Sequence, residues 1–306
     1  MRATFLNRVS GRGLRVFVGL FLLTGCCKLW AVEAKAKTAS AWSVQWQPSQ
    51  LVNGSPVLFQ VKSAQRLKIL SGKWLNHDIE FVLNPKTRTW NAIAGVSLSV
   101  KPGTYTLSLS AVGLNGKDAT FERRVVVRAG TYRSTALTVE GKYTAPSPEQ
   151  QEIIARDRQT KQDTFTKVSA EREWDGSFQP PLDAPFSDTF GTTRTFNGQV
   201  RSTHEGLDFR AVSGTPITAL NAGTVLLARP LYFEGNCVVL DHGQGLLTLY
   251  LHMSEFKVKE GDKVEKGQIL GLVGGTGRAT GPHLHIAVRW QGVYIDPATL
   301  LKMNLP

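Results

Sequence analysis

Two short motifs in the last third of the chain, His204-Glu-Gly-Leu-Asp208 and His283-Leu-His285, most constrain what this sequence can fold into. All but one of the six histidines lie from His204 to His285. Successive side chains of a strand alternate between its faces, so His283 and His285 should point the same way, roughly 7 Å apart. Gly206 and the residues after it indicate a loop running into a strand, which delivers Asp208.

This residue set is typical of a catalytic metal centre. Two histidines and one aspartate with a vacant fourth position usually hold catalytic zinc, whereas structural zinc prefers four protein ligands, mostly cysteines, which this chain does not cluster. A lone His-x-His is weak evidence, because a single strand histidine is more often a core residue. The conjunction with His252, late in the strand-like run 246–252, and with the glycine-rich residues 274–282 favours the metal site.

The motifs resemble, in order and spacing, those of the lysostaphin-type, LytM-like zinc metallopeptidases. The resemblance covers about residues 185–300. It rests on His204-Glu-Gly-Leu-Asp208, Gly235-Asn-Cys-Val-Val-Leu-Asp-His-Gly243, Tyr250-Leu-His252, Gly261-Asp-Lys-Val264, Gly267, Gly271 and Gly281-Pro-His-Leu-His285.

The resemblance implies that His204, Asp208 and His285 hold Zn²⁺, and that His252 and His283 act on the water and the oxyanion. Zinc held by two neutral imidazoles and one carboxylate lowers the pKa of its bound water and polarises a substrate carbonyl. Enzymes of this family hydrolyse peptide bonds in the stems or cross-links of peptidoglycan. We favour the D-Ala to meso-diaminopimelate bond, because an apparent lipobox and a β-sandwich fit an envelope with direct cross-links.

Two further residues, Asn197 and Arg201, are candidate substrate contacts. Some relatives use a tyrosine hydroxyl at the equivalent point to assist the oxyanion, and no tyrosine stands there in this chain. Asn197 or Arg201 could donate in its place or bind stem-peptide carboxylates. The alternative interpretation is an Asn-Gly turn and a surface cation.

Three other features have simpler interpretations. Glu205 lacks the His-Glu-x-x-His context of a metallopeptidase base and should face away from the metal. Cys237 is expected to be a small buried strand residue and not a nucleophile. Residues 274–277 are expected to form a turn before the His-Leu-His strand and not a phosphate cradle, because no helix pattern with Lys-Ser/Thr follows.

The N-terminus has the pattern of a secretory signal, with arginines at positions 2, 8, 12 and 15 and an apolar run over 16–23. Leu23-Thr-Gly-Cys26 resembles a lipobox, which predicts a signal peptide over 1–25 and membrane attachment through a lipidated Cys26. The alternative is a soluble product cleaved near residues 34–36. Either route predicts an exported protein of the periplasm or cell envelope.

The formal charge of +12 falls to +8 when the four leader arginines are subtracted. A moderately basic exported protein has anionic envelope polymers as its natural partners. Nucleic acid is excluded as a partner because the basic residues are spread out and no recognised nucleic-acid module is present. The sequence leaves the oligomeric state open.

The fold class predicted from the strand patterns is mainly β. Turn residues separate short β-rich runs at 56–61, 79–83, 104–112 and 119–127, which predicts an immunoglobulin-like β-sandwich over residues 41–140. A helix-start signal at Ser147 predicts a solvated helical linker over 146–175, with a lid over the active cleft as the alternative. Residues 183–306 should form an antiparallel β peptidase domain.

Two non-catalytic functions remain as alternatives to hydrolysis. Some relatives of the family lack the zinc ligands and activate cell-wall amidases, and a β-sandwich could lead a plain peptidoglycan-binding module. This chain retains all five active-site positions, which favours an enzyme.

Overall fold

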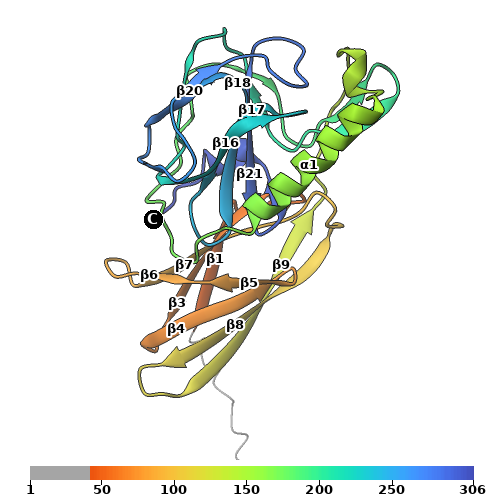
Figure 1. Cartoon of the computed structure of the whole chain (residues 1–306). Coiled ribbons are helices and arrows are strands. Elements are labelled where there is room, and N and C mark those ends of the chain that lie inside the picture. Colours follow the sequence, from red (N-terminus) through yellow and green to blue (C-terminus); the bar gives the residue numbers. More distant parts are fainter. Residues whose placement is uncertain (1–41) are drawn as a thin grey trace, which may run out of the picture. The chain divides into compact units, whose positions relative to one another are not determined.

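The computed structural model describes residues 42–306. The predicted signal peptide (1–25), the lipidation candidate Cys26 and the cleavage region near 34–36 lie outside the described residues. Strands dominate the described part of the chain, as the mainly β prediction requires (Figure 1). Within residues 42–306, no helix is both long enough and apolar enough to span a bilayer.

The first part of the described chain is a β-sandwich. One sheet has the order β1-β3-β7-β6, and the other has the order β2-β9-β8-β4-β5. In the immunoglobulin arrangement, a sheet with the strand order A-B-E-D faces a sheet with the order G-F-C. Here β1, β3, β7 and β6 take the places of A, B, E and D, and β9, β8 and β4 take those of G, F and C. The bounds are β1 (Trp42–Gln47), β2 (Leu51–Val52), β3 (Pro56–Ser63), β4 (Leu67–Trp74), β5 (His77–Glu80), β6 (Val82–Asn84), β7 (Thr89–Gly95), β8 (Gly103–Gly113) and β9 (Asp118–Arg128).

Alternating apolar residues form the core of this sandwich. Leu107 and Leu109 of β8 are buried on one face, and the rings of Phe59 and Trp74 meet edge to face with centroids 5.2 Å apart. The prediction of one continuous strand over 79–83 is wrong. The chain changes sheets at the buried Phe81, so its two halves are β5 and β6 in different sheets.

Helix α1 (Pro148–Phe165) begins where the sequence predicts. Ser147 and Gln150 form a capping box, which satisfies backbone N–H groups at the helix start. The helix ends about ten residues before the predicted end. Residues 166–175 instead run along the neighbouring strands, where the Ser169 N–H donates to the Asp241 carboxylate and the Glu173 N–H donates to the His242 carbonyl.

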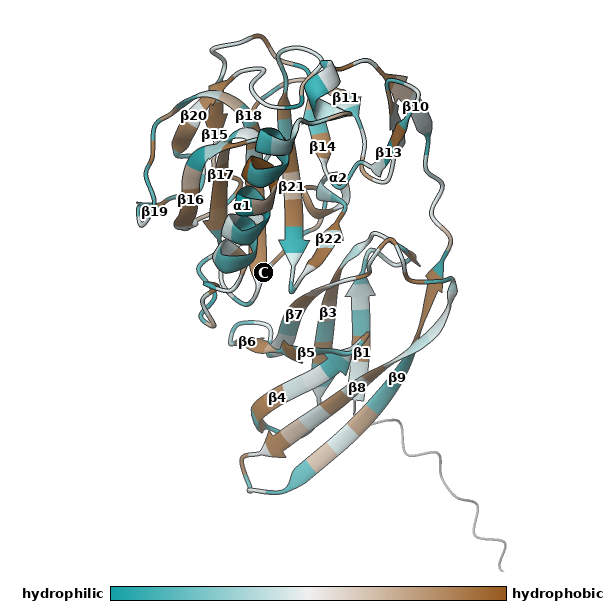
Figure 2. Cartoon of the chain, turned by 45° about the vertical axis from the view of Figure 1, so that its right-hand side comes forward, coloured by the Kyte–Doolittle hydropathy of each residue, from teal (hydrophilic) through white to brown (hydrophobic). Residues whose placement is uncertain are grey.

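The C-terminal part is built on one large, mostly antiparallel sheet whose main path is β11-β14-β21-β18-β17-β16-β19. Its strands β17, β18 and β20 are mainly hydrophobic, whereas α1 is mainly hydrophilic (Figure 2). The bounds are β11 (Phe186–Asp188), β14 (Leu207–Phe209), β15 (Pro216–Thr218), β16 (Gly223–Leu231), β17 (Gly235–Asp241), β18 (Leu246–Phe256), β19 (Lys263–Val264), β20 (Ile269–Val273), β21 (Leu284–Trp290) and β22 (Val293–Ile295), followed by α2 (Pro297–Leu300).

A small sheet of β10 (Ser134–Leu137), β12 (Thr193–Phe196) and β13 (Val200–Thr203) lies beside the candidate site. β10 pairs in parallel with β12. The sequence prediction placed residues 134–137 in the sandwich, but their strand partner belongs to the C-terminal part. A 3-10 turn at Gly141–Tyr143 then leads to α1. The segment that leaves the sandwich is therefore a structural neighbour of the site.

Candidate metal centre

Three neighbouring strands position the predicted site residues. In the antiparallel pair β14–β21, Asp208 lies directly opposite His285. On the other side of β21, Leu251 of β18 is the residue opposite His285, which brings His252 to the same end of the sheet. His204 lies in the loop just before β14, as predicted from Gly206.

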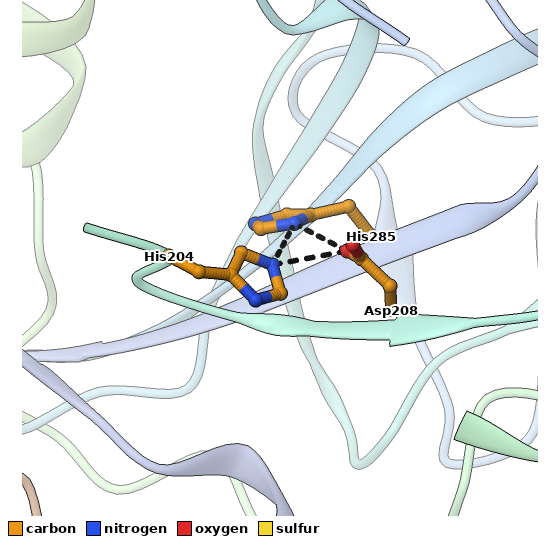
Figure 3. A group of neighbouring side chains, drawn as sticks. All are labelled: His204, Asp208 and His285. Atoms are coloured by element: carbon orange, nitrogen blue, oxygen red, sulfur yellow. Dashed lines mark hydrogen bonds and ion pairs between the residues drawn. The ribbon is translucent and has the colours of Figure 1, made fainter. Parts of the chain in front are cut away.

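One ligand atom from each of His204, Asp208 and His285 forms a small triangle (Figure 3). His204 Nε2 lies 3.0 Å from Asp208 Oδ1 and 3.0 Å from His285 Nδ1, and His285 Nδ1 lies 2.8 Å from Asp208 Oδ1. Tetrahedral zinc with bonds of about 2.1 Å separates its ligand atoms by roughly 3.3 Å. These three atoms therefore need to move apart by only a few tenths of an ångström to hold such an ion.

The protonation of this cluster also suits a metal. His204 Nδ1 lies 2.9 Å from the Thr189 carbonyl oxygen, to which it can only donate, so Nε2 of the neutral ring turns its lone pair toward the centre. Burial raises the pKa of Asp208, but the close approach of the His204 and His285 rings outweighs burial and holds that pKa far below its usual range. Burial lowers the pKa of His285 to about 4. The donor set is thus one carboxylate oxygen and two imidazole nitrogens.

An arginine holds the other oxygen of the Asp208 carboxylate. The Arg194 guanidinium donates to Asp208 Oδ2, and its Nε and Nη2 lie 2.8 and 2.7 Å from Asp188 Oδ2. Because Oδ2 is engaged, Oδ1 is left to face the two histidines. Arg194 therefore orients a candidate ligand from outside the cluster.

His252 and His283 lie beside the triangle with their rings 4.8 Å apart. Nδ1 of His252 lies 2.8 Å from the Thr276 carbonyl oxygen, and Nδ1 of His283 lies 2.8 Å from the Gly281 carbonyl oxygen. Each Nδ1 must donate, so Nε2 is the nitrogen that carries the lone pair in the uncharged form of each ring and can there accept a proton. His252 has a φ of +64°, a left-handed conformation that is uncommon for a residue other than glycine.

Two cavities flank the cluster, with volumes of about 390 and 180 Å³. The larger one is bounded by residues of β10, β11 and β12 and by the loop before β21, and the smaller one lies toward α1, which contributes Lys161. Four residues line both cavities: Arg194, Phe196, His252 and Arg278. The helical linker is thus a wall of the smaller cavity through Lys161, which forms an ion pair with Glu234.

The structure places the other predicted residues as follows. The Asn197 side chain exchanges hydrogen bonds of 3.0 and 2.9 Å with the backbone of Val139, and Arg201 is exposed on β13; neither lines the two cavities. Glu205 is not part of the clustered ligand atoms; it lines the smaller cavity, and burial raises its pKa. Cys237 is buried in β17, as expected, and burial raises the pKa of its thiol.

Sequence reasoning missed Arg194, Asp188 and Arg278. An aspartate and an arginine six residues apart, on either side of a turn, are common surface residues, so no periodicity marks Asp188 and Arg194. Their position beside Asp208 depends on the pairing of β11 with β14, which joins residues twenty positions apart. Arg278 was missed because it lies in a glycine-rich loop, and loop composition does not determine where a side chain points.

The fold and the site define a β protein with a candidate His-Asp-His metal centre and two more histidines beside it. Residues 202–297 match the description Peptidase family M23. The chain therefore contains a domain of peptidase family M23.

Two curated relatives match this domain. Peptidoglycan DD-endopeptidase ShyA of Vibrio cholerae is 44% identical over 103 residues, which are 34% of this chain and 23% of that protein. DD-carboxypeptidase/endopeptidase Mpg of Neisseria meningitidis is 40% identical over 97 residues, which are 32% of this chain and 22% of that protein. The matched stretch of this chain spans about a quarter of the length of these relatives.

Similarity beyond the domain is found in a solved structure. It is a crystal structure of a Pseudomonas aeruginosa protein assigned to the M23 peptidases, with a TM-score of 0.63 and 28% sequence identity, and the match covers 82% of this chain and 95% of that one. The similarity therefore extends past residues 202–297 into the preceding part of the fold.

Proposed function

We propose that this protein is a zinc-dependent endopeptidase that hydrolyses peptide bonds of peptidoglycan, at the D-Ala to meso-diaminopimelate cross-link. The observation that carries the proposal is the convergence of His204, Asp208 and His285 beside two histidines whose Nε2 atoms can accept protons. The names of the relatives, a DD-endopeptidase and a DD-carboxypeptidase/endopeptidase, support the substrate.

We assign the ligand role to His204, Asp208 and His285, with His204 binding through Nε2 and His285 through Nδ1. Zinc bound there would lower the pKa of a bound water and polarise the scissile carbonyl. His252 and His283 orient the attacking water, accept its proton at Nε2 and return a proton to the leaving amine. The protonated ring also stabilises the developing oxyanion.

The substrate reaches this centre through the two cavities, which together form the binding cleft. Their walls are mostly polar and charged side chains, as suits a peptide that carries several carboxylates and amides. Export to the cell envelope, which the N-terminal pattern predicts, would bring the protein to this substrate. Attachment through a lipidated Cys26 belongs to the same proposal and is tested by labelling with a palmitate analogue, which Cys26→Ala should abolish.

The test separates ligands from proton-handling residues. Replacing His204, Asp208 or His285 by alanine removes one of three protein bonds to the metal, so zinc content and muropeptide hydrolysis should fall together. Alanine variants of His252 and His283 should keep near-stoichiometric zinc and lose about 10²-fold or more in turnover. Mass spectrometry of digested, defined muropeptides identifies the bond.

The assignment that this test can most directly contradict lies within the His-Leu-His triplet. If zinc analysis shows that His283→Ala is empty while His285→Ala retains the ion, the ligand assignment is wrong. If the wild-type protein binds zinc and leaves every muropeptide intact, a non-catalytic role replaces the enzyme.

A further inference from the structure

Arg278 lies in the loop between β20 and β21, with its guanidinium held between two aromatic rings. Its Cζ atom lies 4.5 Å from the ring centroid of Phe196 and 4.7 Å from that of Phe233. Its backbone N–H donates to the Phe233 carbonyl, 2.8 Å away. Aromatic faces attract a guanidinium and leave the N–H groups at its edge free to donate. The rings therefore fix the side chain without using its hydrogen-bond donors.

The position of this guanidinium is central to the cleft. Arg278 lines both cavities, together with Arg194, Phe196 and His252. Of these, Phe196 is apolar, His252 is assigned to proton transfer, and Arg194 is fully engaged with Asp188 and Asp208. Arg278 is thus the cation nearest the boundary of the two cavities that remains available to a ligand.

The side-chain donors of Arg278 are available. Among residues 42–306, no acceptor is seen for its side-chain N–H groups, and no buried side-chain N or O atom lacks a partner, so these groups open onto the solvent of the cleft although the side chain is partly buried. Burial lowers the pKa of Arg278, because the charged form loses solvation. A partly buried arginine edge without a partner is a site for an anion, and a carboxylate matches its two parallel donors.

The other cations of the larger cavity are less suited. Arg133 is 67% exposed and lies 3.4 Å from Asp188, which already partners it. Arg210 lines the same cavity, but its side chain is exposed, so solvent weakens any ion pair it forms. A control arginine outside the cleft is Arg229 of β16, which lines neither cavity and whose side chain is half exposed.

We propose that Arg278 binds the free carboxylate next to the scissile amide, and so selects bonds in which the carbon that carries the leaving nitrogen also carries a free carboxylate. This assignment rests on the proposed function. In a D-Ala to D-centre bond, the carbon that carries the leaving nitrogen also carries a free carboxylate, whether the bond is a cross-link or a D-Ala-D-Ala terminus. Peptide bonds within a stem lack this group when the chain continues through that carboxyl. The guanidinium is a specificity determinant and takes no part in proton transfer.

The test uses the zinc-loaded full chain and two matched peptides. Both contain an acylated stem ending in D-Ala-D-Ala, one as the free acid and one as the C-terminal amide. The wild type should favour the acid by about 10- to 100-fold in kcat/KM, the range expected for a hydrogen-bonded pair of opposite charges. In Arg278→Gln, the acid should fall to the level of the amide, mainly through a higher KM, while the amide changes by less than about threefold.

Two further variants complete the design. Arg278→Lys keeps the charge and loses the fork, so it should retain part of the preference for the acid. Arg229→Gln, outside both cavities, should keep all of it. If Arg278→Gln does not reach the zinc content and unfolding temperature of the wild type, Arg278→Lys is compared with the wild type on both peptides instead. A lower kcat/KM on the acid peptide alone then supports the assignment.

Several results would overturn the assignment. An equal loss on acid and amide would indicate a structural role for Arg278. A preference that disappears in Arg229→Gln, or a wild type that cleaves acid and amide equally, would also contradict the assignment. A wild type that cleaves neither peptide and no cross-linked muropeptide would overturn the proposed function itself, and this assignment with it.

Discussion

Replacing Arg194 by lysine should weaken metal binding without removing a ligand. The wild-type guanidinium donates to Asp208 and Asp188 at once, with only 15% of its side chain exposed. Lysine keeps the positive charge but cannot bridge the two carboxylates with a planar fork. The change therefore tests orientation of Asp208 separately from the electrostatic field.

The expected magnitude is that of the hydrogen bond from Arg194 to Asp208, which lysine cannot replace. One hydrogen bond to a buried carboxylate contributes about 1.5–3 kcal/mol. If the whole of this energy is lost from metal binding, zinc affinity falls roughly 10- to 100-fold, which is the range found for residues that orient the ligands of other metal sites. Competition with a chromophoric zinc chelator measures it. The control is Arg133→Lys, because Arg133 contacts Asp188 and Thr189 but not Asp208, from a largely exposed position. It should change the affinity by less than about threefold.

An Arg194→Lys protein that binds zinc within about threefold of the wild type would refute this reasoning. Equal losses in Arg194→Lys and Arg133→Lys would also refute it, because only Arg194 contacts Asp208. The unfolding temperature of each metal-free variant shows whether the domain itself has been weakened.

Three further predictions concern stability. Burial lowers the pKa of His242 to about 4, below the ordinary value of 6.5, so its neutral ring stabilises the fold above pH 6.5 and this contribution is lost as the pH falls toward 4. When the pH is lowered from about 7.5 to about 5, the free energy of unfolding of the wild type should fall by about 2 kcal/mol more than that of His242→Gln, as measured in denaturant titrations. Equal losses in the two proteins would contradict this prediction. Gly243→Ala would place Cβ 1.7 Å from the Glu171 carbonyl oxygen and should lower the free energy of unfolding by at least about 2 kcal/mol, more than Gly214→Ala, which has a similar φ and open space. Ser147→Ala removes the α1 cap and should lower the free energy of unfolding by about 1 kcal/mol, and an unchanged value would show that tertiary contacts alone hold the helix start.

The sequence predicted the parts of the fold that depend on local patterns. β-rich runs between turn residues identified β3, β8 and β9, and the Ser147 signal identified the start of α1, because strand composition, turns and capping act over a few residues. The end of α1 was missed for the opposite reason. Ser169 and Glu173 are held by residues more than sixty positions later in the chain, and no local signal reports such contacts.

The candidate site divides in the same way. Motif spacing placed His204, Asp208 and His285 together, because one loop and two strand faces largely determine their geometry. The side chains around them could not be predicted, since Arg194 reaches Asp208 only through the pairing of β11, β12 and β14. Asn197 shows the converse: a polar residue near a ligand in sequence is used to fasten the segment around Val139 to β12.

Strand alternation alone makes His283 and His285 equivalent, and the neighbouring loop distinguishes them. Nδ1 of His283 is engaged by the Gly281 carbonyl, so only Nε2 faces the site, and this atom lies 3.9 Å from Asp208 Oδ1. His285 instead presents Nδ1, at 2.8 Å from the same oxygen. The Thr276 carbonyl fixes the tautomer of His252 in the same manner. Residues 274–282, which resemble an ordinary glycine-rich turn, therefore determine which histidines are left to move protons and which one is free to bind metal.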